Sequence, residues 1–298
     1  MDAGDHAERF TLLRPLLFTI AYEILGSATE ADDVLQESYL RWSQVDLDQV
    51  RDTKSYLAKL VTRQALNALR AGSRRREDYV GPWLPEPILV DDHDAAQDVV
   101  LAESVSMAML VVLESLSPDE RAVFVLREVF GFEHQDIAAA VGKSVAAVRQ
   151  VARRARQHVH ARRKRFAPPD AAVTARVTEQ FMSAAATGDL EGLLALLAPD
   201  AVWTADSGGK TTASRRPLVG AERIAALVIG LFHRSLPTDL RFETVACNAA
   251  PAVAAFVDGR LTGVFLLTTA DGKVTDLYAI RNPDKLLAMT GAKRISRR

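Results

Sequence analysis

The sequence predicts a multidomain protein in which two all-α units are followed by an α+β domain. Apolar residues recur at helical spacing over 8–75 and again over 97–165. After residue 171, β-branched and alternating segments appear between shorter helical stretches. The segment GPWLPEP separates the two helical units, and its prolines lack the backbone donor that a helix needs. These observations predict four parts, at 8–76, 77–96, 97–167 and 171–290.

The bulk composition describes a globular chain and excludes several classes of protein. The chain has 298 residues, 48% of them hydrophobic, and a net charge of -1. Its single cysteine, Cys247, allows no internal disulfide and no cysteine-based zinc site, and we expect a buried thiol there. We expect neither a metal nor a cofactor. No apolar run reaches the roughly 18 residues of a membrane helix, and the acidic N-terminus lacks a signal core. A cytoplasmic protein without a membrane partner is therefore expected.

The first unit is expected to form three helices. Apolar residues follow one face of the first helix, and Gly26 interrupts it. Either Ser27 or Thr29 can cap the second helix. The third helix is expected to begin near Thr53 and to end near Arg70. One side of it carries basic and amide side chains at spacings of three and four, and two further arginines continue the stripe: Lys59, Arg63, Asn67, Arg70, Arg74 and Arg75.

A helix-turn-helix is predicted in the second unit. A short helix should run from Glu133 to Val141, with a turn at Gly142 and a second helix capped by Ser144. Arg and Gln on a helix in the major groove can bond bidentately to guanine and adenine edges. The early residues of the second helix are therefore candidates for base contacts: Ser144, Ala146, Ala147, Arg149 and Gln150. Three later arginines suit phosphates, since no acid within 144–165 balances their charge: Arg153, Arg154 and Arg156.

The last part of the chain reads as a curved antiparallel sheet packed on helices. Helices are expected near 171–186, 189–197 and 220–232. The segments AVWTAD, RFETVA, AVAAFVD, TGVFLLTTA and KVTDLYAI read as strands. The tripeptide DGK at 271–273, between two apolar runs, predicts a hairpin turn.

Two long motifs resemble those of bacterial sigma factors of the extracytoplasmic-function (ECF) type. ATEADDVLQESYLRW at 28–42 resembles sigma region 2.2, and the segment 116–156 resembles sigma region 4. The resemblance implies binding to the clamp and flap of core RNA polymerase and to promoter DNA. The third helix would then face the -10 element and the helix-turn-helix the -35 element; many members of the family carry an acid in place of Asn67. The residues implied in polymerase binding are Asp32, Asp33, Gln36 and Glu37.

The C-terminal part resembles the SnoaL-like branch of the NTF2-like fold, a cone formed by a bent sheet and helices. WLPEP at 83–87, DGK at 271–273 and NPDKL at 282–286 also resemble a sigma-factor subgroup with such an extension. VACNAAPAV at 245–253 and Ser207 depart from the usual pattern. Because the extension lacks catalytic spacing and is fused to a promoter reader, our hypothesis is that it regulates the chain in cis, and we expect WLPEP and NPDKL to meet in an interface. The residues implied are Trp83, Leu84, Pro85, Asp271, Gly272, Lys273, Asn282, Pro283, Asp284, Lys285 and Leu286.

Other functions stay open at this stage. NTF2-like cones can house isomerases, which need an acid as base; the tempting groups are Asp206, Trp203, Tyr278 and His233. No paired-carboxylate or triad spacing accompanies them, so we interpret Trp203 and Tyr278 as core and Asp206 as a turn cap. A small ligand in the cone, a fused enzyme, and a ligand-responsive regulator acting without polymerase are the alternatives. The basic tail AKRISRR is either a solvated end or a phosphate contact.

Overall fold

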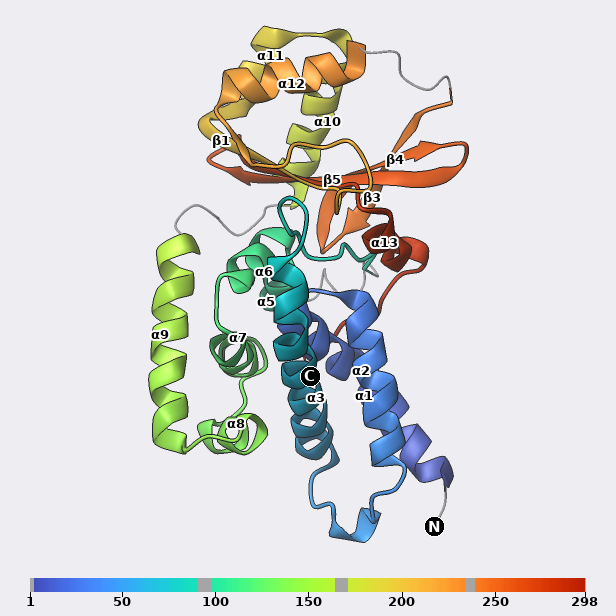
Figure 1. The fold of residues 1–298 in the computed structure, drawn as a ribbon, viewed down its shortest axis with the longest axis vertical. Helices are drawn as coiled ribbons and strands as arrows, with labels where there is room; N and C mark the ends of the chain where they lie inside the picture. Colours follow the sequence, from blue (N-terminus) through green and yellow to red (C-terminus); the bar gives the residue numbers. More distant parts are fainter. Residues whose placement is uncertain (1–2, 91–97, 164–170, 234–238, 298) are drawn as a thin grey trace.

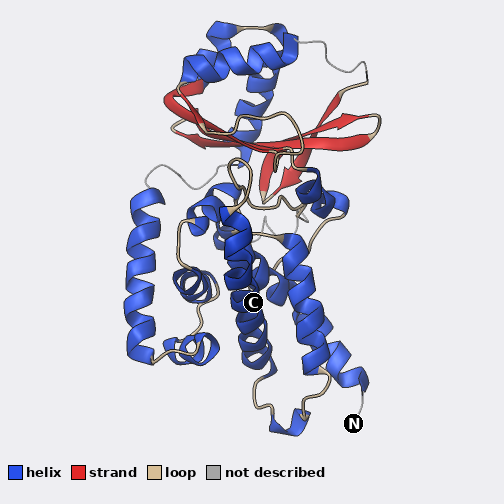
Figure 2. Ribbon diagram, in the orientation of Figure 1, coloured by secondary structure: helices blue, strands red, loops and turns tan. Residues whose placement is uncertain are grey.

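The structure, a computed structural model, describes residues 3–90, 98–163, 171–233 and 239–297. Helices build the lower part of the molecule, and all strands gather in the C-terminal part above it (Figure 2). The C-terminal extension therefore lies on one end of two helical domains (Figure 1). Among the described residues, no helix combines the length and the apolar character needed to cross a membrane.

The N-terminal domain is a packed set of three helices, α1 (Ala3–Leu25), α2 (Ala28–Trp42) and α3 (Thr53–Glu77), with a short 3-10 turn at Leu47–Gln49. The backbone N–H of Glu30 donates to the Oγ of Ser27 over 3.0 Å, so Ser27 caps α2. The third helix is longer than expected, because it continues past Arg70 to Glu77.

The second helical domain consists of five helices and one π-helical turn. They are α5 (Val99–Ser104), α6 (Met107–Glu114), α7 (Pro118–Phe124), the π turn η2 (Val125–Val129), α8 (His134–Val141) and α9 (Val145–Arg163). Gly142 ends α8 with a φ of 72°, a left-handed conformation that glycine adopts without strain. The predicted helix-turn-helix is confirmed in α8 and α9.

The extension is a six-stranded sheet with three helices on one face (Figure 1). The helices are α10 (Ala171–Thr187), α11 (Leu190–Leu196) and α12 (Ala221–His233), and α13 (Pro283–Leu286) and a 3-10 turn (Leu287–Thr290) follow the last strand. The sheet order is β2-β1-β6-β5-β4-β3. The strands are β1 (Leu197–Asp206), β2 (Leu218–Val219), β3 (Arg241–Cys247), β4 (Ala250–Val257), β5 (Arg260–Ala270) and β6 (Lys273–Ile280).

The expectation of an antiparallel sheet was wrong for one pair of strands. β6 runs parallel to β1, with Trp203 opposite Leu277 and Asp206 opposite Ile280. Alternation of side chains indicates a strand but not its neighbour, and β1 and β6 are far apart in the sequence. The hairpin turn at DGK is confirmed: Asp271 and Gly272 have positive φ, as a tight hairpin requires.

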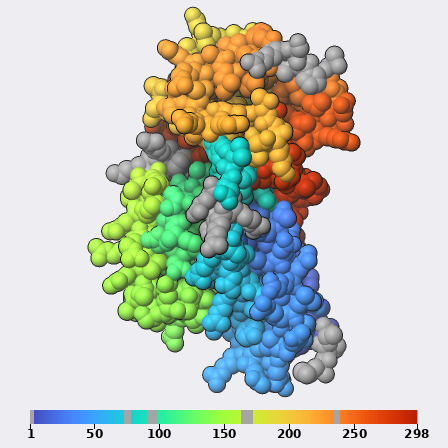
Figure 3. Space-filling view, viewed as in Figure 1, coloured from blue at the N-terminus to red at the C-terminus, as the bar shows by residue number. Residues whose placement is uncertain are grey.

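The linker between the helical domains lies where all three domains meet (Figure 3). Its described residues, 78–90, form no helix, as the prolines predicted, but they are not a loose tether. Leu89 bridges to Cys247 of β3 and Val90 to Lys293 near the C-terminus. Leu84 and Ile88 are buried. The acidic segment 91–97 lies outside the described residues. The linker is thus part of the core that the three domains share.

Candidate promoter-binding surfaces and the contact between domains

The second helix of the helix-turn-helix presents a polar side to solvent. Ser144 caps α9, because the backbone N–H of Ala147 donates to its Oγ over 3.2 Å. Val148 and Val151 are buried on the opposite side. The predicted DNA-contacting side chains are exposed, except the half-buried Ala147: Ser144, Ala146, Arg149, Gln150, Arg153, Arg154 and Arg156. A helix with this side outward is accessible to a major groove.

Two arginines of α9 are paired within their own domain. Arg156 bonds Glu128 of η2 at 2.6 Å, and Arg154 lies 3.5 Å from Glu120 of α7. The argument that no acid balances the charge of α9 was therefore wrong, because the acids come from neighbouring elements. In both pairs the arginine is more than half exposed, so these surface pairs contribute little to stability.

The basic side of α3 is turned toward the helix-turn-helix domain. The Arg63 guanidinium donates to the carbonyl oxygens of Ala139 at 2.8 Å and Ala140 at 3.3 Å, near the end of α8, where carbonyls lack helical partners. Arg70 pairs with Asp119 of α7 at 2.6 Å. We call this arrangement, in which α3 contacts the helix-turn-helix domain, the closed arrangement. In it, Arg63 and Arg70, which were expected to meet promoter DNA, contact protein instead.

The other candidates on α3 differ in accessibility. Lys59 is half-buried and Asn67 is exposed. The backbone of Arg74 and Arg75 belongs to α3, while their side chains lie outside the described residues. Only part of the predicted stripe is thus available in the closed arrangement.

The acidic side of α2 is partly covered by the C-terminal tail. Asp32 pairs with Arg14 at 3.0 Å and with Lys293 of the tail at 2.6 Å. Asp33 and Gln36 are exposed, and the exposed Glu37 pairs with Arg41 at 2.6 Å on the same helix. The four residues implied in polymerase binding are therefore present on one helix, and one of them is occupied by another part of the chain.

The expectation that the basic tail is a solvated end was wrong, and the alternative of a phosphate contact stays a prediction. Ile295 is buried in the core of the helical domains, and the backbone N–H of Ser296 donates to the Oγ1 of Thr19 over 3.1 Å. The backbone N–H of Lys293 donates to the carbonyl of Leu89 over 2.8 Å. The tail is an ordered strap: Ile295 packs in the core, while Lys293 pairs with Asp32 and Arg297 with Asp98.

A buried ion pair joins the extension to the linker. Lys285 and Asp206 are 3% and 0% exposed, and Nζ lies 2.7 Å from Oδ2. The backbone N–H of Leu84 donates to the same carboxylate over 2.8 Å, as does the hydroxyl of Tyr79 over 2.5 Å. Lys285 also donates to the Leu84 carbonyl and lies 3.3 Å from the centre of the Trp83 ring. The predicted contact of WLPEP with NPDKL is confirmed.

The ionisable groups of this cluster are shifted by burial. Removal from water lowers the pKa of Lys285, although the Asp206 carboxylate opposes that change. Burial, followed by the hydrogen bond to Asp206, raises the pKa of Tyr79. The interpretation of Asp206 as a turn cap was incomplete: its Oδ1 accepts from Gly208, 3.2 Å away, but its main partners come from the linker and α13.

Apolar residues surround this pair, and other members of the motifs lie elsewhere. Leu84 and Leu286 pack in one cluster, and Pro85 lies against Gly26. Asn282 caps α13 and donates to the Tyr79 hydroxyl over 2.7 Å, and Pro283 begins that helix. Asp284 pairs with Lys210 of the extension, and Lys273 donates to the Ala195 carbonyl. Asp271–Lys273 lies at the far end of the eight-residue β6, about 25 Å from the linker contact.

A second buried contact depends on one residue that the sequence reasoning did not select. Asn248 is 0% exposed in the β3–β4 turn. Its Oδ1 accepts from the backbone N–H of Ile88 at 3.2 Å, and its Nδ2 donates to the Tyr22 hydroxyl at 2.7 Å and to the Val105 carbonyl at 2.8 Å. One side chain thus bonds the N-terminal domain, the linker and the second helical domain. The sequence feature that could have pointed to Asn248 is a single asparagine within an apolar segment.

The glutamate of WLPEP also escaped the sequence reasoning. Glu86 is buried, and its carboxylate accepts from the Ser27 hydroxyl at 2.8 Å and the Thr29 backbone N–H at 3.0 Å. A carboxylate at the N-terminus of α2 is favoured by the helix dipole. The linker therefore attaches to the N-terminal domain through this residue.

The two helical domains meet around a buried glutamate. Glu23 is 0% exposed, accepts from the Ser104 hydroxyl at 2.6 Å, and contributes its carbonyl to Arg121 at 2.8 Å. Arg121 in turn pairs with Glu114 at 2.6 Å. Burial raises the pKa of the Glu23 carboxyl to about 8, against the lowering effects of Ser104 and Arg121.

This shift predicts a pH dependence of stability. Between about pH 4.5 and 8 the folded chain holds a proton on Glu23 that the unfolded chain has released, so the free energy of unfolding falls as pH rises. Urea unfolding across this range is expected to show a slope of up to about 1.4 kcal/mol per pH unit from this group. Glu23→Gln should remove that component, and an unchanged slope in the variant would contradict the assignment.

The extension contains a cavity of about 440 Å³ between its sheet and α10 and α12. Trp203 and Tyr278 line it, and both are buried as expected. Asp206 follows Ala205 of the wall and points to the opposite side of the strand, toward the linker. His233 is exposed at the end of α12 and lies outside the lining. The four groups suggested for catalysis do not converge.

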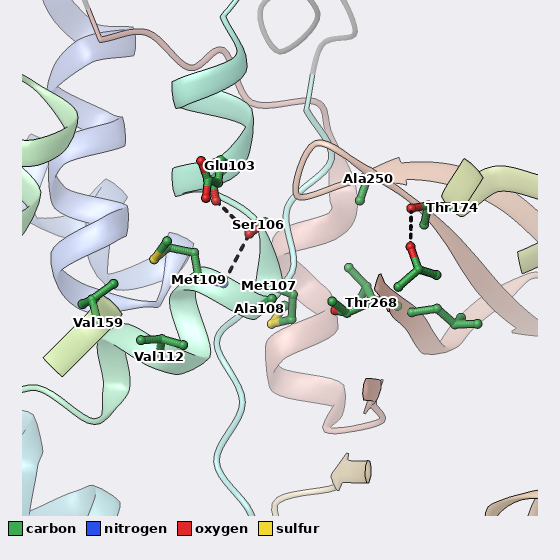
Figure 4. A pocket seen from close by; sticks show the side chains of 13 residues that line it. Glu103, Ser106, Met107, Ala108, Met109, Val112, Val159, Thr174, Ala250 and Thr268 are labelled. Atoms are coloured by element: carbon green, nitrogen blue, oxygen red, sulfur yellow. Dashed lines mark hydrogen bonds between the residues drawn. The ribbon is translucent and has the colours of Figure 1, made fainter. Parts of the chain in front are cut away.

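A smaller cavity of about 40 Å³ lies between the second helical domain and the sheet (Figure 4). Met107 and Ala108 of α6 face Thr268 and Ala250 of the extension across it. This volume has room for water only. Beside it, Met107 packs with Ala252 and Leu266 of the sheet in one buried cluster, so the contact between α6 and the sheet is mostly apolar.

Comparison with known proteins identifies each domain. Residues 10–75 match Sigma-70 region 2, residues 106–159 match Sigma-70, region 4, and residues 178–282 match the SnoaL-like domain. The chain is 37% identical over 290 residues to the ECF RNA polymerase sigma factor SigJ of Mycobacterium tuberculosis, covering 93% of this chain and 91% of that protein. The probable ECF RNA polymerase sigma factor SigI of the same species is 32% identical over 275 residues, with 92% of each chain covered.

The fold agrees with these similarities. The crystal structure of M. tuberculosis SigJ superposes with a TM-score of 0.76 at 33% identity and covers 95% of this chain and 99% of that one. Two helical domains, one with a helix-turn-helix and one with an acidic α2 beside a basic α3, define a promoter-recognition sigma factor. The chain belongs to the ECF RNA polymerase sigma factors that carry a C-terminal SnoaL-like domain.

Proposed function

We propose that the chain binds the clamp and flap of core RNA polymerase, reads the -35 element with α9 and the -10 element with α3, and is partly inhibited by its extension. The polymerase-binding side chains would be those on α2, with Asp33 and Gln36 accessible at once. The names of the relatives as RNA polymerase sigma factors support this partner. The domain limits that we propose are 8–76, 97–167 and 171–290, joined by the linker 77–96.

One observation carries the regulatory part of this proposal. Arg63 and Arg70 of α3 are bonded to the helix-turn-helix domain, so α3 cannot meet DNA along its whole basic side until the two domains separate. The extension opposes separation, because Asn248 and the Lys285–Asp206 pair bind the linker from outside. A closed arrangement that covers a promoter-reading face is inhibitory.

Proteins of this build need no catalytic group of their own, since polymerase forms the bonds. The cavity of the extension is the candidate site for a signal molecule and has no carboxylate among its described lining residues. We therefore assign it binding and not turnover. A ligand that prefers the open arrangement would release the promoter-reading faces.

Transcription in vitro tests the proposed function. Core polymerase with the full-length chain is expected to start at promoters selected from a random library, and polymerase alone is not. Arg149→Ala should lower promoter affinity by about 5- to 150-fold, the effect of losing one bidentate base contact. Arg223→Ala, at an exposed arginine of α12, is the matched control and should leave affinity unchanged. Equal transcripts with and without the chain would refute the sigma assignment.

A further inference from the structure

The cavity of the extension has the chemistry of a specific binding site. Its described lining is apolar and aromatic on the walls, with Phe181, Trp203 and Phe265 among them. Its volume of about 440 Å³ falls within the range of sites for small molecules. Such walls favour an apolar ligand body, because burying apolar surface is the main favourable contribution.

One charged residue stands among the described lining residues. Arg281 is half-buried, and one of its guanidinium nitrogens donates to the Thr212 carbonyl over 2.8 Å. A Cβ at Gly263 would lie 3.6 Å from the Arg281 stem and 3.4 Å from the Phe265 ring, which is ordinary contact distance, so both side chains lie beside this position of β5. Within the described residues, Arg281 pairs with no carboxylate.

The neighbouring polar groups place Arg281 at the mouth. Thr212 and Ser214, which also line the cavity, are exposed. The Ser214 hydroxyl donates to the Arg216 carbonyl over 2.5 Å, and that of Thr262 donates to the Ala255 carbonyl over 3.1 Å. These hydroxyls are engaged with the backbone, whereas the remaining guanidinium N–H groups are available to a ligand. A guanidinium binds carboxylate or phosphate bidentately.

We propose that the cavity binds an apolar small molecule with one anionic group, whose carboxylate or phosphate is held by Arg281. The class is an acidic amphiphile, such as a fatty acid or an acidic polycyclic compound. Apolar contacts with the walls bind the body of the ligand. Arg281 binds its charged group at the mouth of the cavity, near water.

The same residue lies beside the contact between domains. The backbone N–H of Arg281 donates to the Asp206 carbonyl over 2.7 Å, and the next residue, Asn282, bonds Tyr79 of the linker. An anion that shifts Arg281 therefore acts on the segment that holds Asp206 and Lys285. This coupling rests on the proposed inhibitory function; the binding itself does not.

Calorimetry with the full-length chain tests the binding, with dodecanoate and dodecanol as probes. Dodecanoate is expected to bind, and Arg281→Met should weaken it at least tenfold while changing the affinity for dodecanol less than threefold. Arg281→Lys should restore part of the affinity for dodecanoate. Leu227→Trp, which fills the cavity, should abolish binding of both probes, and Arg260→Met, at an exposed arginine of β5, should change neither.

The results separate the site from its coupling. Equal loss of both probes in Arg281→Met, or no binding of either to the unchanged chain, would overturn the site. The amount of transcript is then measured with and without dodecanoate. Dodecanoate is expected to change it for the full-length unchanged chain and not for Arg281→Met. Binding without any change of transcription would overturn the coupling alone, and a chain that binds dodecanoate but directs no transcription would instead overturn the proposed function.

Discussion

Lys285→Met is expected to open the contact between the extension and the linker. The substitution leaves the Asp206 carboxylate buried without its cation, a defect that costs about 3–5 kcal/mol in comparable buried pairs. Faster hydrogen exchange at the Leu84 backbone N–H, which donates to that carboxylate, is the direct measurement. Because opening uncovers α3, we also expect promoter-directed transcription to rise.

A matched control exists in the same domain. Lys210 pairs with Asp284 on the surface, where both side chains are at least half exposed, so Lys210→Met should cost less than about 1 kcal/mol. The double variant Asp206→Asn with Lys285→Met removes both charges and should recover part of the loss, because a buried pair is costly chiefly when it is broken. Unchanged exchange at Leu84 in Lys285→Met would show that the pair does not hold the linker.

Asn248→Asp is expected to have the second large effect. A carboxylate at this buried position loses the donor that binds the Val105 carbonyl and faces that oxygen with negative charge. Leaving a buried charged group without its partner costs about 3 kcal/mol or more, which urea unfolding at pH 8 would measure. The loss should shrink toward acid pH, since burial raises the pKa of the new carboxyl and protonation restores a donor.

Another turn with the same backbone conformation supplies the control. Asp258 has a similar positive φ of 50° in the exposed β4–β5 turn, so Asp258→Asn makes the reverse exchange without burial. Its effect should stay within about 0.5 kcal/mol. Equal effects of the two substitutions would mean that the turn conformation, and not the bonds of Asn248, decides the stability.

Both predictions concern contacts between residues far apart in the chain. Tyr79 and Leu84 reach Asp206, and Tyr22 reaches Asn248, so each contact forms only when separate domains meet. If these contacts set the balance between closed and open arrangements, one substitution changes the exposure of α3 and the access of polymerase to α2 together. The closed arrangement is therefore assembled from distant parts of the chain, and under the proposed function it would be the regulatory state.

The sequence by itself determined the local structure and the family. Apolar periodicity located the helices, Gly142 and Ser144 located the helix-turn-helix, and the DGK turn located the last hairpin. Each of these signals depends on residues within about one helical turn or one hairpin of each other. The likeness of two motifs to a known subgroup also predicted the contact of WLPEP with NPDKL.

Tertiary structure alone decided the partners of the buried polar groups. Asp206 looks like an ordinary turn residue until the linker brings a backbone N–H and α13 brings Lys285. The parallel pairing of β6 with β1 and the packing of Ile295 depend on elements that the chain reaches only at its end. Burial and hydrogen bonding between distant segments are properties of the assembled core, and no local pattern encodes which segment will supply the partner.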